Sequence, residues 1–363
     1  MSTSASATSR LANFDIALLH TKVQQLMGQQ RYELEISREL RALRQEQCRF
    51  TPISVSSIRS QLTSDLRLPM RVTSRAPLRV QRLVMRSFLG KYDLVHRMDL
   101  QLPSSPTEVV TVHDVAPLHF PDEGWLPIHA ATSLKQARAV VAPSGFAADD
   151  IANAFDIDRP TVVYNGVPGD AFDQHTLDPQ TLRKIGVQGP FLLHCGGASN
   201  RKNLQGLRAA WRILRGQIAD VQLVLAGPVD ARRTQLFANE SGVLLLGHLD
   251  RETLLGLMTS ATAVVVPSLY EGFGFPAVEA MASRTAVVAT REGSLPEICG
   301  DAALLCDADP EALAHSLGEV LQDNQLRTAL VEAGRPRARM FTWESAAEGY
   351  LAVYRMCLDL PLE

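Results

Sequence analysis

The chain has 363 residues, of which 46% are hydrophobic, and this size favours two globular domains over one. Its formal net charge of −3 argues against a dedicated nucleic-acid binder. The five cysteines are scattered without a metal-ligand spacing, and no apolar run approaches the roughly 20 residues that span a bilayer, so a reduced, cytoplasmic protein is expected.

Strand-like apolar runs alternate with helical stretches along most of the chain, which is the pattern of parallel α/β layering. In the first half, this pattern predicts a helix at residues 31–45 and strands at residues 14–19, 108–112, 139–142 and 161–163. The last of these strands leads to Asn165-Gly166, which is a turn signal.

A second α/β series begins after residues 171–189, which are polar and rich in turn residues and therefore predict a linker between domains at residues 1–170 and 190–342. Strands are expected at residues 191–195, 221–225, 243–246, 263–266, 286–289 and 303–305. Helices are expected at residues 204–215, 252–260, 277–283, 310–322, 326–332 and 343–358. Two doubly wound halves predict two Rossmann-like domains that face each other across a cleft.

The most informative segment is Glu-Gly-Phe-Gly-Phe-Pro-Ala-Val-Glu at residues 271–279. Gly272 and Gly274 free the backbone for a positive φ or for close approach to a ligand. Pro276 suits the first turn of a helix, where a missing N–H group costs nothing. The segment therefore predicts a tight loop that leads into a helix N-terminus, whose N–H groups and dipole favour an anionic ligand.

Two carboxylates stand at the ends of this segment, Glu271 on the loop and Glu279 in the expected first helical turn. A carboxylate can accept hydrogen bonds from two hydroxyl groups at once, and both a sugar and a ribose offer such pairs. The two glutamates are thus able to hold both ends of a nucleotide-sugar. The alternative is a capped surface helix with solvated glutamates.

A second glycine-rich loop, Gly-Gly-Ala-Ser-Asn-Arg-Lys-Asn at residues 196–203, follows the first strand of the second half. Gly196 and Gly197 permit a tight turn from strand to helix. Arg201 and Lys202 then lie just before a helix N-terminus, which is the natural position for a pyrophosphate. A purely structural strand-to-helix turn has the same appearance.

Together these motifs resemble the signature of retaining GT-B glycosyltransferases, in particular glycosyltransferase family 4 (group 1), with mannosyltransferase-like members. The resemblance rests on Glu-Gly-Phe-Gly-Phe-Pro, on the Glu-Ala-Met-Ala that starts at Glu279, and on Arg-Lys-Asn at residues 201–203. Phe275 stands where Leu or Ile is commoner in that family. The Thr-Val-His-Asp run at residues 111–114 is similar to the family's His-Asp strand end.

The resemblance implies that most of the donor lies on the second domain. Catalytic roles are expected for His113, Arg201, Lys202 and Glu271. Donor binding is expected from Gly196, Gly197, Arg201, Lys202, His248, Leu249, Glu271, Gly272, Phe273, Gly274, Phe275 and Glu279. Within this set, Arg201 and Lys202 would neutralise the diphosphate, Glu271 would bind the sugar and Glu279 the ribose.

The acceptor side is expected at Gly28, Arg31 and Tyr32, which are similar to the family's Gly-x-Gly-Arg-Tyr loop. Gln30 replaces the second glycine of that loop, and its bulk puts a close phosphate approach in doubt. The resemblance also implies that the closing helix, at residues 343–363, packs back on the first domain.

The implied activity is that of a retaining hexosyltransferase (EC 2.4.1.-), with mannose from GDP-mannose weakly favoured over a UDP-sugar. The acceptor would be a glycan or a lipid-linked glycan in surface polysaccharide biosynthesis. No cofactor and no metal are expected, because no Asp-x-Asp pair stands in a suitable loop. The alternatives are a nucleotide-sugar epimerase or phosphorylase on the same scaffold and a non-catalytic GT-B partner subunit.

Basic residues gather between Arg38 and Arg97, where thirteen lysines and arginines face four acidic residues. Arg79, Arg82 and Arg86 have the spacing of one helix face. Two interpretations stay open, a solvated basic face and a peripheral contact with an anionic membrane or a phosphate-bearing acceptor. The second would place the enzyme at the inner face of the cell membrane.

Overall fold

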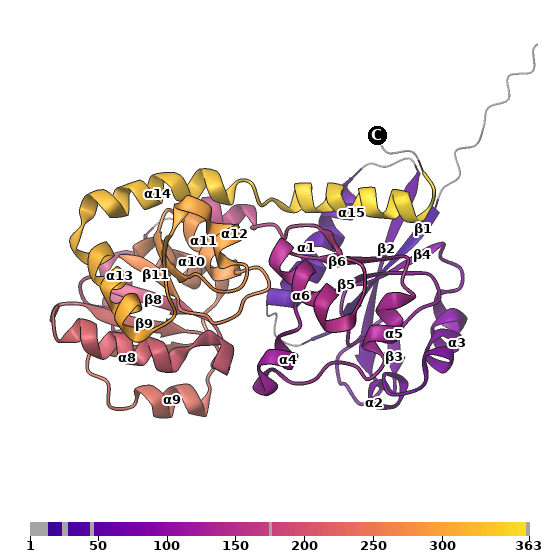
Figure 1. Cartoon of the computed structure of the whole chain (residues 1–363), viewed down its shortest axis with the longest axis horizontal. Coiled ribbons are helices and arrows are strands. Elements are labelled where there is room, and N and C mark those ends of the chain that lie inside the picture. Colours follow the sequence, from indigo (N-terminus) through magenta and orange to yellow (C-terminus); the bar gives the residue numbers. More distant parts are fainter. Residues whose placement is uncertain (1–13, 24–27, 44–46, 174–175, 361–363) are drawn as a thin grey trace, which may run out of the picture. The chain divides into compact units, whose positions relative to one another are not determined.

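The computed structural model describes residues 14–23, 28–43, 47–173 and 176–360. The chain divides into two compact units, and its strands form two sheets (Figure 1). The first unit comprises the described residues of Met1–Val112, Pro127–Val141 and Ala347–Glu363, and the second comprises those of His113–Leu126 and Ala142–Ala346. The predicted class of two Rossmann-like α/β domains is confirmed, and the predicted domain boundaries stay a prediction.

The first sheet has seven strands in the order β3-β2-β1-β4-β5-β6-β7. Its strands are β1 (Phe14–Thr21), β2 (Cys48–Ser57), β3 (Leu66–Leu68), β4 (Leu94–Arg97), β5 (Glu108–Thr111), β6 (Ala139–Ala142) and β7 (Thr161–Val162). The helices of the first unit are α1 (Gly28–Ala42), α2 (Met70–Thr73), α3 (Leu78–Leu89) and α5 (Ala130–Lys135). The strand order reverses beside β1, as in a doubly wound fold.

The second sheet has six strands in the order β10-β9-β8-β11-β12-β13, and all its pairs are parallel. Its strands are β8 (Phe191–Cys195), β9 (Gln222–Ala226), β10 (Val243–Gly247), β11 (Ala263–Val266), β12 (Ala286–Thr290) and β13 (Leu304–Cys306). Here the order reverses between β8 and β11, which is the switch point where ligands bind in such sheets.

Helices of the second unit are α4 (Ala116–His119), α6 (Gly145–Phe155), α7 (Pro179–Lys184), α8 (Leu204–Arg215), α9 (Ala231–Phe237), α10 (Arg251–Ser260), α11 (Phe275–Ala282), α12 (Leu295–Cys299), α13 (Pro310–Gln322) and α14 (Asn324–Ala338). Short 3₁₀ turns are η1 (Pro121–Glu123), η2 (Gly169–Phe172), η3 (Asn200–Lys202) and η4 (Gly300–Ala302). The last helix, α15 (Trp343–Cys357), contributes residues to both units.

Both faces of the second sheet are buried, which explains why its strands are continuous apolar runs. Successive side chains of a strand point to opposite faces, so Leu192 and Leu193 of β8 belong to two different cores. The core around Leu193 includes residues of α10, α11 and α12. The core around Leu192 includes residues of α8 and α13. This double packing fixes the strand ends that carry the candidate site.

A buried hydroxyl network holds α15 within the first unit. The Tyr32 hydroxyl lies 2.6 Å from the Tyr350 hydroxyl, and the Thr111 hydroxyl lies 2.9 Å from the same Tyr350 oxygen. His96 contacts Thr111 through Nε2 at 2.8 Å and the Tyr354 hydroxyl through Nδ1 at 2.6 Å. All five side chains are buried, so these polar groups satisfy one another in place of water.

Several elements differ from the sequence-based expectation. No strand was predicted between residues 47 and 97, where β2, β3 and β4 lie. Strand β2 contains Pro52 and many polar residues, features that argue against a strand, yet its pairing with β1 overrides them. The helix expected at residues 31–45 is α1, which ends at Ala42, and residues 44–45 lie outside the described residues. Helix α7 lies in the segment predicted as linker.

Gly166 marks a close approach of two backbones in the second unit. A Cβ atom at this position would overlap the backbone nitrogen of Trp343. The neighbouring peptide is held there by a hydrogen bond from Val167 N to Phe341 O at 2.8 Å. By contrast, a Cβ on Gly169 would meet no atom within 4 Å.

We therefore expect Gly166→Ala to lower the free energy of unfolding by about 1–3 kcal/mol or more, because the backbone must shift to admit the methyl group. The matched variant Gly169→Ala should change it by no more than about 0.5 kcal/mol. Thermal or urea unfolding of the two variants beside the wild type measures both values. Equal stabilities of the two variants would contradict this packing.

Candidate functional site

Glu271 lies in the loop between β11 and α11, and its side chain is almost fully buried at 5% exposure. One carboxylate oxygen, Oε1, accepts hydrogen bonds from Lys202 Nζ at 2.5 Å and from the Ser268 hydroxyl at 2.7 Å. The other, Oε2, accepts from Arg201 Nη1 at 3.1 Å. The three charged residues predicted from two separate motifs therefore form one cluster.

The topology of the sheet explains this meeting. Strands β8 and β11 are parallel neighbours, so the loops that follow them leave the same edge of the sheet. The loop after β8 carries Arg201 and Lys202, and the loop after β11 carries Glu271. The cluster thus stands at the switch point of the second sheet.

Glu271 is a carboxylate at neutral pH although it is buried. Burial alone would raise the pKa of its carboxyl, but the charges of Lys202 and Arg201 outweigh that effect and lower the pKa to about 2. Burial lowers the pKa of the Lys202 ammonium, and Glu271 opposes that shift. Removing one partner of such a pair would leave a buried charge without compensation.

The loop after β8 has the conformation that a tight strand-to-helix turn requires. Asn203 adopts a left-handed backbone with φ 50° and caps α8, its side chain accepting from Gly206 N at 3.2 Å. Gly196 and Gly197 are half-buried, and a Cβ on Gly197 would meet no atom within 4 Å. The space beside the Gly197 backbone is therefore open at the Cβ position.

His113 follows β5 and lies against the Glu271 loop. A Cβ on Gly272 would overlap the backbone oxygen of His113, so only glycine allows this approach. The Ser144 hydroxyl donates to Gly272 O at 2.6 Å and fixes the loop from the other side. The side chain of Asp114 accepts from Ala116 N at 3.0 Å, which is an Asx-type turn.

The start of α11 presents backbone donors. Gly274 caps the helix with φ 93°, and a Cβ there would come within 2.9 Å of Leu295 Cδ2. Among the residues that the structure describes, none accepts a hydrogen bond from the N–H groups of Phe273 and Gly274. The Phe273 ring is buried and packs on Phe275 at 5.2 Å between centroids, so these two residues offer a ligand their backbone.

Glu279 is buried in α11 at 6% exposure and accepts from Arg251 Nη1 at 3.0 Å. The expected position in the first turn is wrong, because α11 begins at Phe275 and Glu279 is its fifth residue. Arg251 also binds Asp170, with Nη2 at 2.7 Å from Oδ1. His248 is exposed and Leu249 half-buried in the loop after β10.

The predicted acceptor-side residues belong to the first unit. Gly28 is the first residue of α1, and Arg31 is half-buried in the same helix. Tyr32 is fully buried in the hydroxyl network described above, a position that serves packing. Direct contact of these residues with an acceptor stays a prediction.

Sequence reasoning missed three contacts of this site, those of Ser268, Arg251 and Glu123. Ser268 lies three residues before Glu271, but no pattern distinguishes it from other loop serines. Arg251 reaches Glu279 from α10, and Glu123 reaches Arg201 across 78 positions of sequence. Contacts of such separation follow from the fold and leave no local signal.

Within the described part of the chain, no group of three or more His, Cys, Asp or Glu side chains is arranged to hold a metal ion. That finding concerns the protein alone, and independence of metal stays a prediction. In the same residues, no helix is both long and apolar enough to cross a bilayer.

Comparison with known proteins shows the family to which this chain belongs. Residues 27–171 match Glycosyltransferase Family 4, and residues 182–337 match Glycosyl transferases group 1. The chain is 30% identical to alpha-maltose-1-phosphate synthase of Mycolicibacterium smegmatis over 68% of its own length and 72% of that protein. The chain belongs to the group 1 glycosyltransferases of family 4.

Two further similarities agree with this assignment. O-antigen chain mannosyltransferase B of Escherichia coli is 28% identical over 68% of this chain and 70% of that protein. The structure of sucrose-phosphate synthase from Thermosynechococcus elongatus superposes with a TM-score of 0.72 at 21% identity, covering 96% of this chain and 100% of the other. At this identity the second likeness shows the fold alone.

A buried histidine, His194, lies in β8 just before the glycine-rich loop of this glycosyltransferase. His194 is 1% exposed, and its Nδ1 lies 3.2 Å from the backbone oxygen of Val265, which can only accept. Nδ1 therefore carries the proton of the neutral ring. Burial is the main reason why the pKa of this imidazole is lowered from 6.5 to about 4, and the nearby charge of Lys202 adds to the effect.

We predict that this histidine makes the fold sensitive to acid. Below pH 6.5 the unfolded chain takes up a proton at His194, whereas the folded chain does not until about pH 4. The free energy of unfolding should therefore fall by about 1 kcal/mol per pH unit between pH 6 and pH 5. Unfolding of wild type and His194→Gln at both pH values measures this slope, and an equal slope in the variant would contradict the assignment.

Proposed function

We propose that this glycosyltransferase transfers a hexose from a nucleotide-sugar to a glycan or lipid-linked acceptor with retention at the anomeric carbon. The observation that carries the proposal is the buried cluster of Glu271, Arg201 and Lys202 beside the unoccupied N–H groups at the start of α11. Mannose from GDP-mannose is the favoured donor, since an O-antigen mannosyltransferase is among the relatives. That likeness also favours a role in surface polysaccharide biosynthesis. A location at the inner face of the cell membrane is part of the proposal and rests on the basic surface of α3 described below.

Glu271 has room for one sugar hydroxyl. A carboxylate offers about four lone-pair positions, and three of them accept from Lys202, Ser268 and Arg201. The remaining position on Oε2 would bind a hydroxyl of the transferred sugar, and the N–H groups of Phe273 and Gly274 would bind a further oxygen. Because its protein contacts fix the carboxylate, it needs little reorganisation when the donor binds.

Arg201 and Lys202 would stabilise the departing diphosphate. As the bond between the anomeric carbon and the phosphate oxygen breaks, negative charge grows on that oxygen. The acceptor hydroxyl attacks the anomeric carbon from the same face, and its proton passes to the leaving phosphate. Glu279 would bind the ribose, and His113 would contact the sugar from its position against Gly272.

A panel of donors tests this function. Thermal shifts of the wild type with GDP-mannose, UDP-glucose, ADP-glucose and dTDP-glucose should single out one nucleotide. A donor at about 100 times its Kd should stabilise the chain by roughly 2.7 kcal/mol. The favoured donor should then be consumed only when an acceptor is present. Turnover without acceptor would indicate an epimerase, a need for inorganic phosphate would indicate a phosphorylase, and binding without turnover would indicate a non-catalytic subunit.

With the donor known, Lys202→Ala should reduce kcat by roughly 100-fold, on the order of 3 kcal/mol, because a charge that acts on the leaving group is removed. Lys184→Ala, which removes an exposed lysine of α7, is the matched control and should leave kcat unchanged. Near-normal turnover in Lys202→Ala would contradict the role of Lys202 in the reaction.

Helix α3 supports a peripheral membrane contact of the first unit. Arg79 and Arg86 are exposed on it, together with Val80 at 47% and Leu83 at 71% exposure. Ile128, beside α5, is 73% exposed. Basic and apolar side chains on one helix suit the interface of an anionic membrane, where the charges meet lipid phosphates and the apolar groups enter the headgroup layer.

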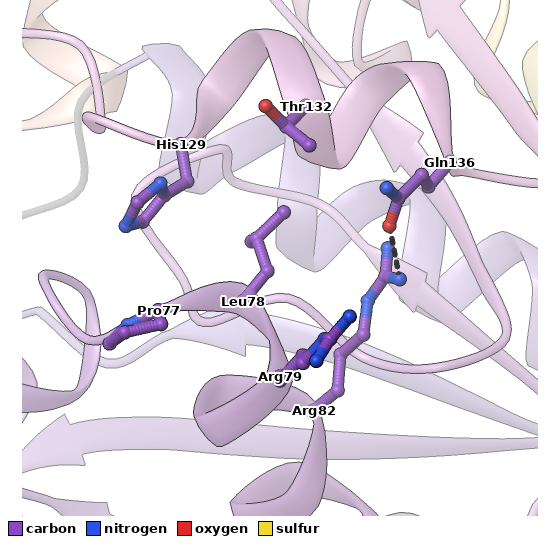
Figure 2. A pocket seen from close by; sticks show the side chains of 7 residues that line it. All are labelled: Pro77, Leu78, Arg79, Arg82, His129, Thr132 and Gln136. Carbon is purple, nitrogen blue, oxygen red and sulfur yellow. Dashed lines mark hydrogen bonds between the residues drawn. The ribbon is translucent and has the colours of Figure 1, made fainter.

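A cavity of about 430 Å³ opens at the start of this helix, lined by Pro77, Leu78, Arg79, Arg82, His129, Thr132 and Gln136 (Figure 2). Arg82 donates to Gln136 Oε1 at 2.5 Å and to the Ser104 hydroxyl at 3.3 Å, so its guanidinium is held at the cavity wall. None of the predicted donor-binding residues lines this cavity. Its two guanidinium groups suit a lipid phosphate.

Reversing Arg79, Arg82 and Arg86 to glutamate should lower binding to vesicles of anionic phospholipid by more than about tenfold at low salt, since each basic residue near the surface contributes about 1 kcal/mol. The matched control reverses Arg183, Lys184 and Arg339, three exposed basic residues of the second unit. Cosedimentation measures both variants. Equal binding of the two would count against a contact through α3.

A further inference from the structure

Two consecutive carboxylates contact the loop after β8, which is proposed to hold the donor diphosphate. Asp122 and Glu123 form part of the 3₁₀ turn η1. The Asp122 Oδ2 atom accepts from the backbone N–H of Asn200 at 2.9 Å and from Arg232 Nη1 at 2.9 Å. Glu123 Oε1 accepts from Arg201 Nε at 2.5 Å. A backbone N–H and two guanidinium groups therefore converge on this acidic turn.

These donors are the kind that bind phosphate oxygens, namely loop N–H groups and arginine side chains. The carboxylate oxygens take the hydrogen bonds that diphosphate oxygens would take at the same loop. Asp122 and Glu123 are 20% and 22% exposed at the side chain, so the contacts are partly shielded from water. The acidic turn η1 thus provides the negative charge that a bound diphosphate would provide at the loop after β8.

We propose that the Asp122-Glu123 turn occupies the diphosphate position in the free enzyme, is displaced when the donor binds, and returns to expel the nucleoside diphosphate after transfer. This inference rests on the proposed function and adds to it a competing group within the chain. Arg201 would keep its bond to Glu271 through Nη1 and exchange only the partner of Nε.

Charge makes the exchange necessary. In the free enzyme the two cations Arg201 and Lys202 are matched by the two carboxylates of Glu271 and Glu123. A diphosphate brings at least two further negative charges to the same loop. Like charges a few ångströms apart repel strongly in a site that is partly shielded from water. The donor and Glu123 therefore compete for Arg201.

The backbone permits such a movement at one end of the turn. Residues before it are held, because His113 lies against Gly272 and the Val115 N–H donates to the Tyr270 hydroxyl at 3.3 Å. Gly124, directly after it, has φ 104° and no atom within 4 Å of where its Cβ would stand. Gly124 therefore gives the turn backbone freedom at its C-terminal end, where a change of conformation meets no steric obstacle at the Cβ position.

Glu123→Gln and Asp122→Asn test the proposal by removing the competing charge at nearly constant shape. Isothermal titration with GDP and UDP should show binding that is tighter than in the wild type by a factor of roughly two to five, the upper part of the range for an exposed ion pair. Product inhibition by the same diphosphate should strengthen by the same factor. Glu332→Gln, which removes an exposed glutamate of α14, is the matched control and should bind like the wild type.

Trp125 gives a second readout, because it lies two residues beyond Glu123 and is 50% exposed, whereas Trp211 and Trp343 are buried. Diphosphate binding should change the tryptophan fluorescence of the wild type, and Trp125→Phe should abolish that change while it still binds. In Glu123→Gln, part of the change should already be present without ligand.

The outcomes separate the two proposals. If the wild type binds diphosphate and the variants bind it equally or more weakly, Glu123 merely positions Arg201 and the competing turn is refuted. Binding without any change at Trp125 refutes it as well. If neither the wild type nor the variants bind any nucleoside diphosphate, the proposed function fails together with it.

Discussion

The second unit is organised around one buried carboxylate that stays ionised. Glu271 keeps its charge because Lys202 and Arg201 lie within hydrogen-bond distance, and burial would otherwise favour its neutral form. Each partner is needed by the others, since a buried charge without a counter-charge is costly. Two glycines allow close backbone contacts of this loop: Gly272, within the loop, meets the backbone of His113, and Gly293 meets that of Glu271. The charged cluster and the close backbone contacts therefore depend on the same loop conformation.

Much of this charged cluster could be predicted from sequence, because it depends on local motifs and on a regular topology. Glycines and a proline marked the loop before α11, and parallel strand order brought the loops after β8 and β11 to one edge. Contacts made across long separations could not be predicted in this way. Glu123 reaches Arg201 from the 3₁₀ turn η1, which is 78 positions earlier in the sequence. Nothing in the Pro-Asp-Glu sequence of that turn indicates this partner.

In the first unit, the sequence was a poorer guide to the structure. Strand β2 carries a proline and many polar residues, so its sequence hides a strand that eight paired positions with β1 hold in place. Tyr32 belongs to a motif that suggests the acceptor loop, yet its phenol is committed to Thr111 and Tyr350. A motif identifies the residues that a family shares, but packing decides which of them face a ligand.

Gly293 has a consequence for how substitutions in this chain should be interpreted. A Cβ there would stand 2.7 Å from the Glu271 nitrogen, and φ is +61°. Any side chain at this position would therefore displace Glu271 from Arg201 and Lys202. In a saturation library, position 293 should therefore tolerate as few replacements as position 271 itself. A residue without chemistry of its own would then tolerate as few substitutions as the carboxylate that we propose binds the sugar.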